Sequence, residues 1–330
     1  MNAGIIGVGS YVPKKVLTNF ELEKMIDTSD EWIRTRTGIA ERRVVDSGTF
    51  TSDLAAQAGL KALDEAKVSP QEIDLMIVAT SSPDMIFPST ACLAQNKMGL
   101  KDCPAFDISA ACTGFVYALA VADSFISSKT FEKVLVIGAD ALTRHVNWKD
   151  RNTCVLFGDG AGAVILGPVA KDYGILANYL AADGDGANLL KIPAGGSQLP
   201  GSEDSFREGL HFVSMNGNEV FKFAVRVIPE AVRKVLSQTG ISLEEVNYII
   251  PHQANQRIIE AAVSRLKVKP EKMVSNISKY GNTSTASIPL VIDELWKEGN
   301  LKSGDLILLV GFGAGLTWGA SLIRWHKDPD

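Results

Sequence analysis

Cys112 is the residue in this chain best placed to act as a nucleophile. It lies within the run Ala-Ala-Cys-Thr-Gly-Phe (110–115), between an apolar stretch over 105–108 and an amphipathic helical pattern over 116–126. This order predicts a strand that ends before the cysteine and a helix that begins at it. The unpaired N–H groups and the dipole at a helix start favour a thiolate over a thiol. The pattern therefore predicts an activated cysteine.

Two later segments supply partners for such a thiolate. His252 lies in Pro-His-Gln-Ala-Asn (251–255), directly after an apolar run, and Asn282 lies in Gly-Asn-Thr-Ser-Thr-Ala-Ser (281–287). A cysteine with a histidine and an asparagine at strand ends and helix starts makes a nucleophile with two hydrogen-bonding partners. We expect Cys112, His252 and Asn282 to form one catalytic set.

Each of the three also has a plainer interpretation. A cysteine in an apolar protein is commonly a packing residue, a lone histidine is commonly a satisfied core residue, and an asparagine after glycine is commonly a turn or a cap. The other cysteines and histidines lack a comparable context. We assign them to packing or to no special role: Cys92, Cys103, Cys154, His145, His211 and His326.

Bulk composition excludes several classes of protein. The chain has 330 residues, is 46% hydrophobic and 22% charged, and carries a formal net charge of -5, which disfavours a nucleic-acid binder. The uncharged stretch over 306–323 contains four glycines, so two buried strands joined by a turn fit better than a membrane helix. The N-terminus lacks the features of a signal peptide, and no Cys-x-x-Cys pair is present. We expect a cytoplasmic protein with neither disulfides nor a metal site.

Glycine-rich segments give only weak signals for nucleotide binding. The segment 7–9 lacks the third glycine of a dinucleotide fingerprint, and the segment 158–162 has no phosphate-binding lysine. Turns are the better interpretation of both segments.

The chain repeats its own pattern. The segment 68–77 matches 241–250 at an offset of 173 (241 − 68), and the strand pattern at 134–138 matches 307–311 at the same offset (307 − 134). The segment 162–166 matches 319–323 at an offset of 157 (319 − 162). The first half therefore carries about 16 extra residues between these anchors. At the larger offset Cys112 aligns with position 285, three residues from Asn282.

A constant offset predicts two similarly folded halves, residues 1–170 with the cysteine and residues 171–330 with the histidine and asparagine. Strands and helices alternate in each half, which is typical of a largely parallel sheet covered on both faces. For the first half the pattern predicts a helix over 53–66, a strand over 75–79, a helix over 90–98 and a strand over 105–108. The active site is then expected where the halves meet, at the carboxyl ends of the strands.

These strings resemble the β-ketoacyl-[acyl-carrier-protein] synthase III family of the thiolase superfamily, the condensing enzymes that start type II fatty-acid synthesis. The resemblance extends over nearly the whole chain and includes Asp-Glu-Trp-Ile-Arg-Thr-Arg-Thr-Gly-Ile (30–39). Asn282 at the third position, where elongating enzymes carry histidine, favours the initiating class. The resemblance implies an α/β protein with a duplicated, five-layered α/β/α/β/α architecture, assembled as a homodimer.

The resemblance also implies roles for further residues. The residues implied for coenzyme A binding are Trp32, Arg36, Arg151, Gly217, Ala254 and Asn255. Those implied for the acyl pocket are Phe87 (from across a dimer interface), Leu142, Phe157 and Phe312, with Phe212 as a further wall. Those implied for binding the acyl carrier protein are Lys222, Arg257, Arg265 and Lys267. The backbone N–H groups of Cys112 and Ala314 would form the oxyanion hole. Many relatives carry glycine at the position of Ala314, and a positive φ there would cost about 1 kcal/mol.

The reaction implied is a two-stage condensation. Cys112 takes a short acyl group from acyl-coenzyme A, and malonyl-carrier protein then loses carbon dioxide and attacks that acyl group. Both thioesters are substrates, and no cofactor is expected. The alternatives are a related condenser of polyketide or secondary-metabolite synthesis, a degradative thiolase, and a carrier-binding paralogue without chemistry. No second cysteine near residue 282 or 311 supports a thiolase.

Overall fold

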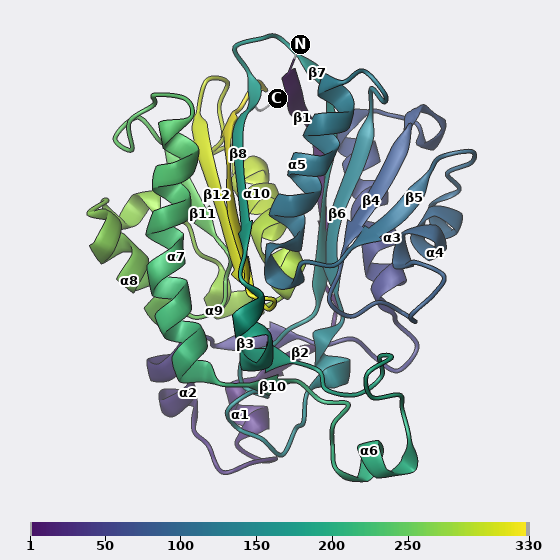
Figure 1. Cartoon of the computed structure of the whole chain (residues 1–330), viewed down its shortest axis with the longest axis vertical. Helices are drawn as coiled ribbons and strands as arrows, with labels where there is room; N and C mark the ends of the chain where they lie inside the picture. Colours follow the sequence, from purple (N-terminus) through teal and green to yellow (C-terminus); the bar gives the residue numbers. More distant parts are fainter. Residues whose placement is uncertain (1, 328–330) are drawn as a thin grey trace.

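Two mixed β-sheets form the frame of the computed structural model, which describes residues 2–327 (Figure 1). The five-stranded sheet has the order β1 (Asn2–Tyr11), β7 (Gly160–Val169), β6 (Val134–Asp140), β4 (Leu75–Ala79) and β5 (Ala105–Ile108). The four-stranded sheet has the order β11 (Tyr248–Pro251), β12 (Leu306–Gly313), β13 (Thr317–Arg324) and β8 (Gly174–Ala182). Strand β4 runs parallel to β5 and β6, and β11 runs parallel to β12.

Helices cover both faces of each sheet. Helices α3 (Thr51–Ala66) and α4 (Thr90–Met98) lie outside the first sheet, and α7 (Gly217–Ser237) and α8 (Gln256–Leu266) lie outside the second. Helices α5 (Gly114–Ser127) and α10 (Ser287–Lys297) lie between the two sheets. The result is the five-layered α/β/α/β/α arrangement that the family resemblance implies.

The central layer is strongly apolar because both of its faces are covered. Phe115, Val116 and Leu119 of α5 are fully buried and share one core cluster with Ile292 of α10 and Leu309 of β12. Burying one such side chain contributes about 1.5–3 kcal/mol. Removing the Phe115 ring would cost about 3–5 kcal/mol, because the close-packed centre cannot collapse around the cavity.

The duplication is visible in the elements themselves. A 3₁₀ turn over Ala111–Thr113 leads into α5 at Gly114, and a 3₁₀ turn over Ser284–Ala286 leads into α10 at Ser287, 173 residues further on (287 − 114). Strand β5 has only a weak counterpart, the isolated parallel bridge between Ile249 and Met273. Edge strand β5 therefore distinguishes the first sheet from the second.

Most of the predicted elements have their expected bounds. The strands at 75–79 and 105–108 and the helix at 90–98 agree with the structure, and the stretch 306–323 forms two strands. The helix predicted from residue 53 begins at Thr51. The helix expected to begin at Cys112 begins at Gly114, because the 3₁₀ turn intervenes.

Shorter elements connect the strands and helices of the two sheets. They are β2 (Val16–Thr18), α1 (Asn19–Leu22), α2 (Asp30–Thr37), β3 (Glu41–Arg43), β9 (Leu190–Lys191), α6 (Glu203–Arg207), β10 (Ser214–Met215) and α9 (Ile277–Tyr280). Of these, α1, α2, β2, β3, β10 and α6 lie at the lower end of Figure 1. Arg42 of β3 is fully buried and donates hydrogen bonds to Leu17 O, Asn19 Oδ1 and Val155 O. Burial lowers the pKa of Arg42 only to about 10, so it remains a cation that cross-links this end.

Four further 3₁₀ turns lie in the connections between helices and strands, at Pro70–Glu72, Leu142–His145, Gly184–Leu189 and Pro270–Lys272. Within residues 2–327, the helices are too short or too polar to cross a bilayer.

Candidate active site

Cys112 lies in the turn between β5 and α5, with its sulfur buried at the junction of the two halves. The preceding residue, Ala111, adopts a left-handed backbone with φ 47°, a conformation that costs a non-glycine residue about 1 kcal/mol. Ser284, from the equivalent turn of the second half, donates a hydrogen bond from Oγ to Cys112 Sγ at 3.4 Å and is itself left-handed, with φ 51°. Two strained turns thus meet at the sulfur.

The turn between β12 and β13 is fastened to the nucleophile's turn. Thr317 Oγ1 donates to Ala110 O at 2.9 Å, and Thr113 Oγ1 donates to Thr317 O at 3.1 Å. At Gly313 a Cβ atom would lie 2.7 Å from Cys112 N, so only glycine permits this approach. Ala314 is not among the described residues with positive φ. The conformational cost of a positive φ at an alanine therefore does not arise here.

His252 directly follows β11 and is almost fully buried. Its Nδ1 lies 2.7 Å from Ser287 Oγ at the start of α10, and its ring packs edge-on against Phe312 at 5.1 Å. Burial lowers the pKa of His252 to about 3, so the imidazole is neutral near pH 7. When Ser287 donates its hydroxyl proton to Nδ1, the proton of the neutral ring is on Nε2. His252 is then a hydrogen-bond donor at Nε2.

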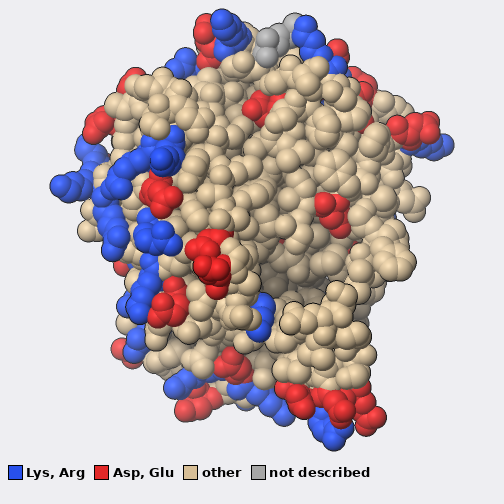
Figure 2. Space-filling view, viewed as in Figure 1, with Lys and Arg blue, Asp and Glu red and all other residues tan. Residues whose placement is uncertain are grey.

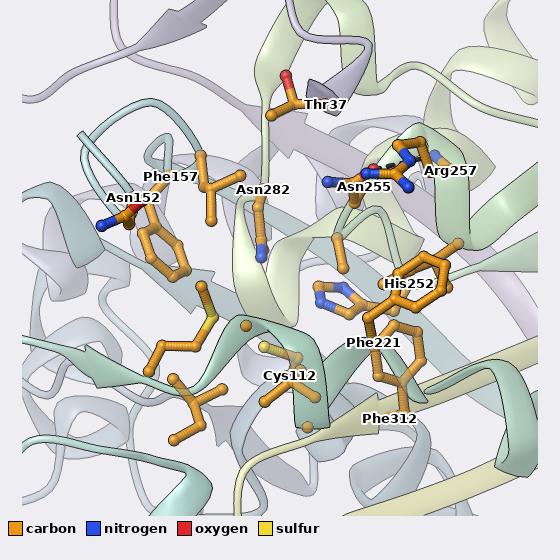
Figure 3. A pocket seen from close by; sticks show the side chains of 18 of the residues that line it. Thr37, Cys112, Asn152, Phe157, Phe221, His252, Asn255, Arg257, Asn282 and Phe312 are labelled. Atoms are coloured by element: carbon orange, nitrogen blue, oxygen red, sulfur yellow. Dashed lines mark hydrogen bonds between the residues drawn. The ribbon is translucent and has the colours of Figure 1, made fainter. Parts of the chain in front are cut away.

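Asn282 is fixed by its backbone and by one end of its amide. Its N–H donates to Leu156 O at 2.8 Å, and its carbonyl accepts from Gly158 N at 3.0 Å. Its Oδ1 accepts from Ser284 N at 2.9 Å, which leaves the NH₂ end to face the cavity. Figure 3 shows the side chains of Cys112, His252 and Asn282 pointing into one shared space.

Asp140, at the end of β6, ties the two halves together beside the site. Its buried carboxylate accepts from Thr80 Oγ1, Ser81 N and Ser82 Oγ of the first half at 2.7–3.1 Å. It also accepts from the N–H and the hydroxyl of Thr285 in the second half, at 3.1 and 2.8 Å. Asp140 therefore sets the position of the turn that carries Ser284 relative to Cys112.

Two cavities meet at Cys112. The larger, of about 230 Å³, runs past His252 and Asn282 to an opening near Trp32, Arg36 and Arg257. The second, of about 210 Å³, lies on the other side of the cysteine and is lined by Leu142, Phe157, Ile192, Val213, Ser81, Ser284 and Ala314, among others. Cys112 and Phe157 line both, so a chain entering by one cavity could place a group in the other.

Five of the six residues expected to bind coenzyme A line the larger cavity: Trp32, Arg36, Gly217, Ala254 and Asn255. Arg151 does not line it. The Arg151 guanidinium lies 5.0 Å from the centre of the Trp32 ring, in direct cation–π contact. An adenine could lie between them only after Arg151 moves. Asn255 also joins the halves, because its Nδ2 donates to Arg36 O at 3.1 Å.

The residues expected at the acyl pocket fall into three groups. Leu142 and Phe157 line the second cavity, Phe157 lines the larger one as well, and Phe312 lines only the larger one, beside His252. Phe212 stacks on His211 and lines neither cavity. Phe87 is 82% exposed and contributes to neither cavity of the single chain.

The four residues expected to dock a carrier protein are also dispersed. Only Arg257 lines the larger cavity, where its guanidinium lies over Phe221. Lys222 is paired with Glu219 at 2.8 Å, Arg265 lies in a separate groove, and Lys267 caps α8. Because Arg257 shares the opening with Trp32 and Arg36, we expect its replacement to impair the use of coenzyme A as well.

Two predictions about cysteines are wrong in the structure. Burial, the largest effect, raises the pKa of the Cys112 thiol to about 12, although the Ser284 hydrogen bond opposes this rise. The resting residue is therefore a neutral thiol rather than a stable thiolate. Cys92, assigned to packing, is exposed, whereas Cys103 and Cys154 are buried. Cys92 will compete for small alkylating reagents.

Several positioning residues escaped the sequence analysis: Ser284, Ser287, Thr317, Thr113 and Asp140. The hydroxyl-rich run 282–287 ahead of an apolar helix was the visible signal for Ser284 and Ser287.

Comparison with known proteins agrees with this geometry. Models of 3-oxoacyl-[acyl-carrier-protein] synthase III match residues 106–184, and those of its C-terminal part match residues 236–325. A β-ketoacyl-[acyl-carrier-protein] synthase III from Caldanaerobacter subterraneus is 55% identical over 98% of both chains. The crystal structure of the synthase III from Aquifex aeolicus is 51% identical, covers 98% of this chain and 100% of its own, and has a TM-score of 0.91.

A structure further from this chain in sequence has the same fold. The priming β-ketosynthase of the R1128 polyketide pathway is 34% identical, covers 99% of this chain and 97% of its own, and has a TM-score of 0.91. The fold and the site thus define a condensing acyltransferase with the duplicated thiolase-like architecture. Within that class, the chain belongs to the β-ketoacyl-[acyl-carrier-protein] synthase III family.

The raised pKa of Cys112 makes a testable prediction. Because thiolate is the reactive form and its fraction rises about tenfold per pH unit below the pKa, alkylation of Cys112 should accelerate steadily from pH 7 to pH 10. Ser284→Ala should slow it further at each pH, by about fivefold, since one hydrogen bond to the sulfur is lost. Peptide mapping by mass spectrometry separates Cys112 from Cys92. A plateau for Cys112 below pH 9 would contradict the neutral resting thiol.

The lowered pKa of His252 predicts how stability depends on acid. The folded value of about 3 lies below the unfolded value of about 6.5, so His252 destabilises the fold as pH falls from 6.5 toward 3. One such proton gives a slope of about 1.4 kcal/mol per pH unit. His252→Gln should lose that slope between pH 6 and pH 4 in urea unfolding. An unchanged slope would mean that His252 is protonated in the folded protein.

Proposed function

We propose that this protein joins a short acyl group from acyl-coenzyme A to malonyl-acyl-carrier protein, releasing coenzyme A and carbon dioxide and forming 3-oxoacyl-carrier protein. This reaction initiates type II fatty-acid biosynthesis, in the cytoplasm. The observation that carries the proposal is the convergence of Cys112, His252 and Asn282 where an open cavity meets an inner one. Relatives at 50–55% identity named for this reaction support it.

In the first stage Cys112 Sγ attacks the acyl thioester. A bond forms from sulfur to the acyl carbon, the bond to the coenzyme A sulfur breaks, and the thiol proton ends on the leaving thiol. The dry site favours neutral Cys112, so loss of the proton accompanies attack rather than preceding it. The backbone N–H groups of Cys112 and Ala314 stabilise the oxyanion that takes up the charge.

In the second stage the malonyl thioester enters the vacated cavity and loses carbon dioxide. Negative charge then develops on its thioester oxygen. His252 Nε2 and Asn282 Nδ2 are donors held in place by Ser287 and Ser284, so they need little reorganisation to meet that charge. Neutral donors suit a site this buried, because a resident cation would pay a large desolvation cost. The carbanion then attacks the acyl carbon on Cys112, the bond from that carbon to Sγ breaks, and the released thiolate takes up a proton from water to restore the thiol.

The two cavities suggest how the substrates divide the site. Trp32, Arg36, Gly217, Ala254 and Asn255 line the route for the pantetheine arm, with Arg151 joining Trp32 at its outer end. Leu142 and Phe157 line the space for the acyl group. A volume of about 210 Å³ favours a short primer over a long chain.

Replacing the enolate donors tests the division of roles. Asn282→Ala should reduce malonyl decarboxylation about 10²–10³-fold and leave acylation of Cys112 less affected, because the lost NH₂ group serves only the second stage. His252→Ala should behave alike. The two rates are measured separately, with radiolabelled acyl-coenzyme A and with release of carbon dioxide. Decarboxylation at the wild-type rate in Asn282→Ala would leave this residue a purely structural role.

We also propose a homodimer built on the edge of the first sheet. β5 is an edge strand, all four of its residues are only partly buried, and the nearby loop exposes Met85, Ile86 and Phe87. Apolar side chains exposed to this degree, beside an unpaired strand, favour pairing with a second copy across a two-fold axis. Phe87 would then reach the partner's acyl cavity.

A charged residue in that loop tests the assembly. Ile86→Asp should shift sedimentation at micromolar concentration from dimer to monomer, because burying an unpaired carboxylate is costly. Phe20→Asp, which alters an exposed aromatic residue of α1 at the lower end of Figure 1, apart from β5, is the matched control and should leave the dimer intact. A wild-type monomer under these conditions would remove both the dimer and the role of Phe87.

A further inference from the structure

Gln253 has a fully buried side-chain amide, and both ends of that amide form hydrogen bonds. Its Nε2 donates to Pro251 O at 2.6 Å and to Val274 O at 3.3 Å. Its Oε1 accepts from Ser275 Oγ at 2.7 Å and from Asn276 N at 3.3 Å. Both donors and both acceptor positions of the amide are thereby used. One side chain thus joins the last residue of β11 to the segment 274–276, which leads into α9.

The two segments that this amide joins carry the two hydrogen-bond donors of the second stage. His252 directly precedes Gln253 in the chain, and Asn282 follows α9 after a single residue, Gly281. Gly281 has φ 66°, and a Cβ atom there would lie 2.8 Å from Leu156 O. Because this turn is closely packed, a shift of the segment before α9 would be passed on to Asn282. The position of Asn282 relative to His252 therefore depends on Gln253.

Helix α10 contacts the same two segments. Its first residue, Ser287, has its hydroxyl oxygen 2.7 Å from His252 Nδ1. Glu294, two turns further along the helix, accepts from Asn276 Nδ2 and from Tyr280 Oη, each at 2.7 Å, and so holds both ends of α9. The histidine and α9 are thus both held by one helix, and the Gln253 amide completes the connection between them.

The backbone of Gln253 also bears on which nitrogen of His252 carries the proton. Gln253 N donates to Ser287 Oγ at 3.4 Å, on the same oxygen that faces His252 Nδ1. A hydroxyl oxygen that accepts this N–H has its own proton available for Nδ1. The proton of the neutral imidazole is then on Nε2, the nitrogen that donates to the substrate.

We propose that Gln253 is a positioning residue of the second stage. Its amide sets the separation of the two donors, His252 Nε2 and Asn282 Nδ2, and its N–H sets the tautomer of His252. The inference rests on the proposed function, in which these donors meet the thioester oxygen of the malonyl substrate. Gln253 lines neither cavity, so it acts through its neighbours. The turn of Cys112 is fastened separately, by Thr317, so the first stage should depend on Gln253 much less.

Replacing the amide by an apolar side chain of similar length tests the proposal. Gln253→Met removes all four side-chain hydrogen bonds with little change in volume. On enzyme acylated beforehand, the kcat of malonyl decarboxylation should fall about tenfold, because misplaced donors meet the developing charge poorly, while acylation of Cys112 stays within about twofold of wild type. Release of carbon dioxide and transfer of a radiolabelled acyl group measure the two rates.

KM for malonyl-carrier protein should change little in Gln253→Met. The substitution is buried and neutral, so it leaves the charged surface as it is, including the Lys and Arg side chains that Figure 2 shows gathered along the side of α7 and α8. A loss confined to kcat of one half-reaction is the pattern expected when an interaction made in the transition state is weakened.

Two further readouts separate positioning from a general effect on the fold. In the Asn282→Ala background the additional loss caused by Gln253→Met should shrink to about threefold, because only His252 remains to be displaced. Gln253→Glu should recover decarboxylation relative to wild type as the pH is lowered from about 8 to about 6, because burial favours the protonated carboxyl and that form donates to Pro251 O as the amide does.

Leu63→Ala is the control for loss of stability. Leu63 is buried in α3 of the first half and lines neither cavity, so its truncation should lower the urea midpoint and leave both half-reactions near the wild-type rate. Ser275→Ala keeps the test available if Gln253→Met does not fold. It removes one hydrogen bond to Gln253 Oε1 from an exposed residue, and it should slow decarboxylation alone, by about twofold.

Three results would overturn the role of Gln253. They are decarboxylation at the wild-type rate in Gln253→Met, equal losses in the two half-reactions, and an undiminished loss in the Asn282→Ala background. If only Ser275→Ala folds, unchanged decarboxylation in that variant has the same meaning. A wild-type protein that is not acylated by acyl-coenzyme A, or that releases no carbon dioxide from malonyl-carrier protein, would instead contradict the proposed function itself.

Discussion

The buried carboxylate of Asp140 is the constraint on which the site depends. It lies at the end of a strand of the first half and accepts five hydrogen bonds, three from the first half and two from Thr285 of the second. A buried charge is tolerated only when its acceptor capacity is filled, so neither half can shift without leaving it unpaired. Beside it, a Cβ at Gly138 would lie 2.3 Å from Thr285 O, so the two backbones are in contact. The active site is therefore a property of the joined halves.

This constraint explains how a buried, neutral site can still support ionic chemistry. Desolvation raises the pKa of Cys112 and lowers that of His252, so both groups rest uncharged. In the proposed mechanism, the negative charge that develops on the thioester oxygen atoms meets hydrogen-bond donors that are already in place. Two left-handed turns and the Thr113–Thr317 fastening hold those donors, and the strain is offset by the packing of the central layer. The thiol of Cys112 and the imidazole of His252 thus remain neutral until a substrate brings charge into the cavity.

The frame and the convergence of Cys112, His252 and Asn282 could be predicted from the sequence because both leave regular patterns. Apolar runs indicated β4, β5 and α4, and the repeated offset alone placed Cys112 close to Asn282. The pKa of Cys112 could not be predicted in this way, since a helix start and a dry cavity act in opposite directions and only the fold shows which dominates. Nor could Ser287 or Thr317 be found, because their partners lie 35 and 204–207 residues away.

The outer surface and the cavity offer different kinds of contact to a substrate. In the cavity, apolar walls and neutral donors exclude water, and recognition there concerns the thioester arm common to both substrates. Arg257 lines the opening of this cavity, where we expect it to lie beside that shared arm. To distinguish a small thioester from one carried by a protein, an enzyme needs contacts beyond the reach of the arm. Such contacts lie on the solvent-exposed surface, where charged side chains remain hydrated. Helices α7 and α8 run from the cavity wall to the outer surface, so one rigid layer connects the site with the exposed face of the molecule.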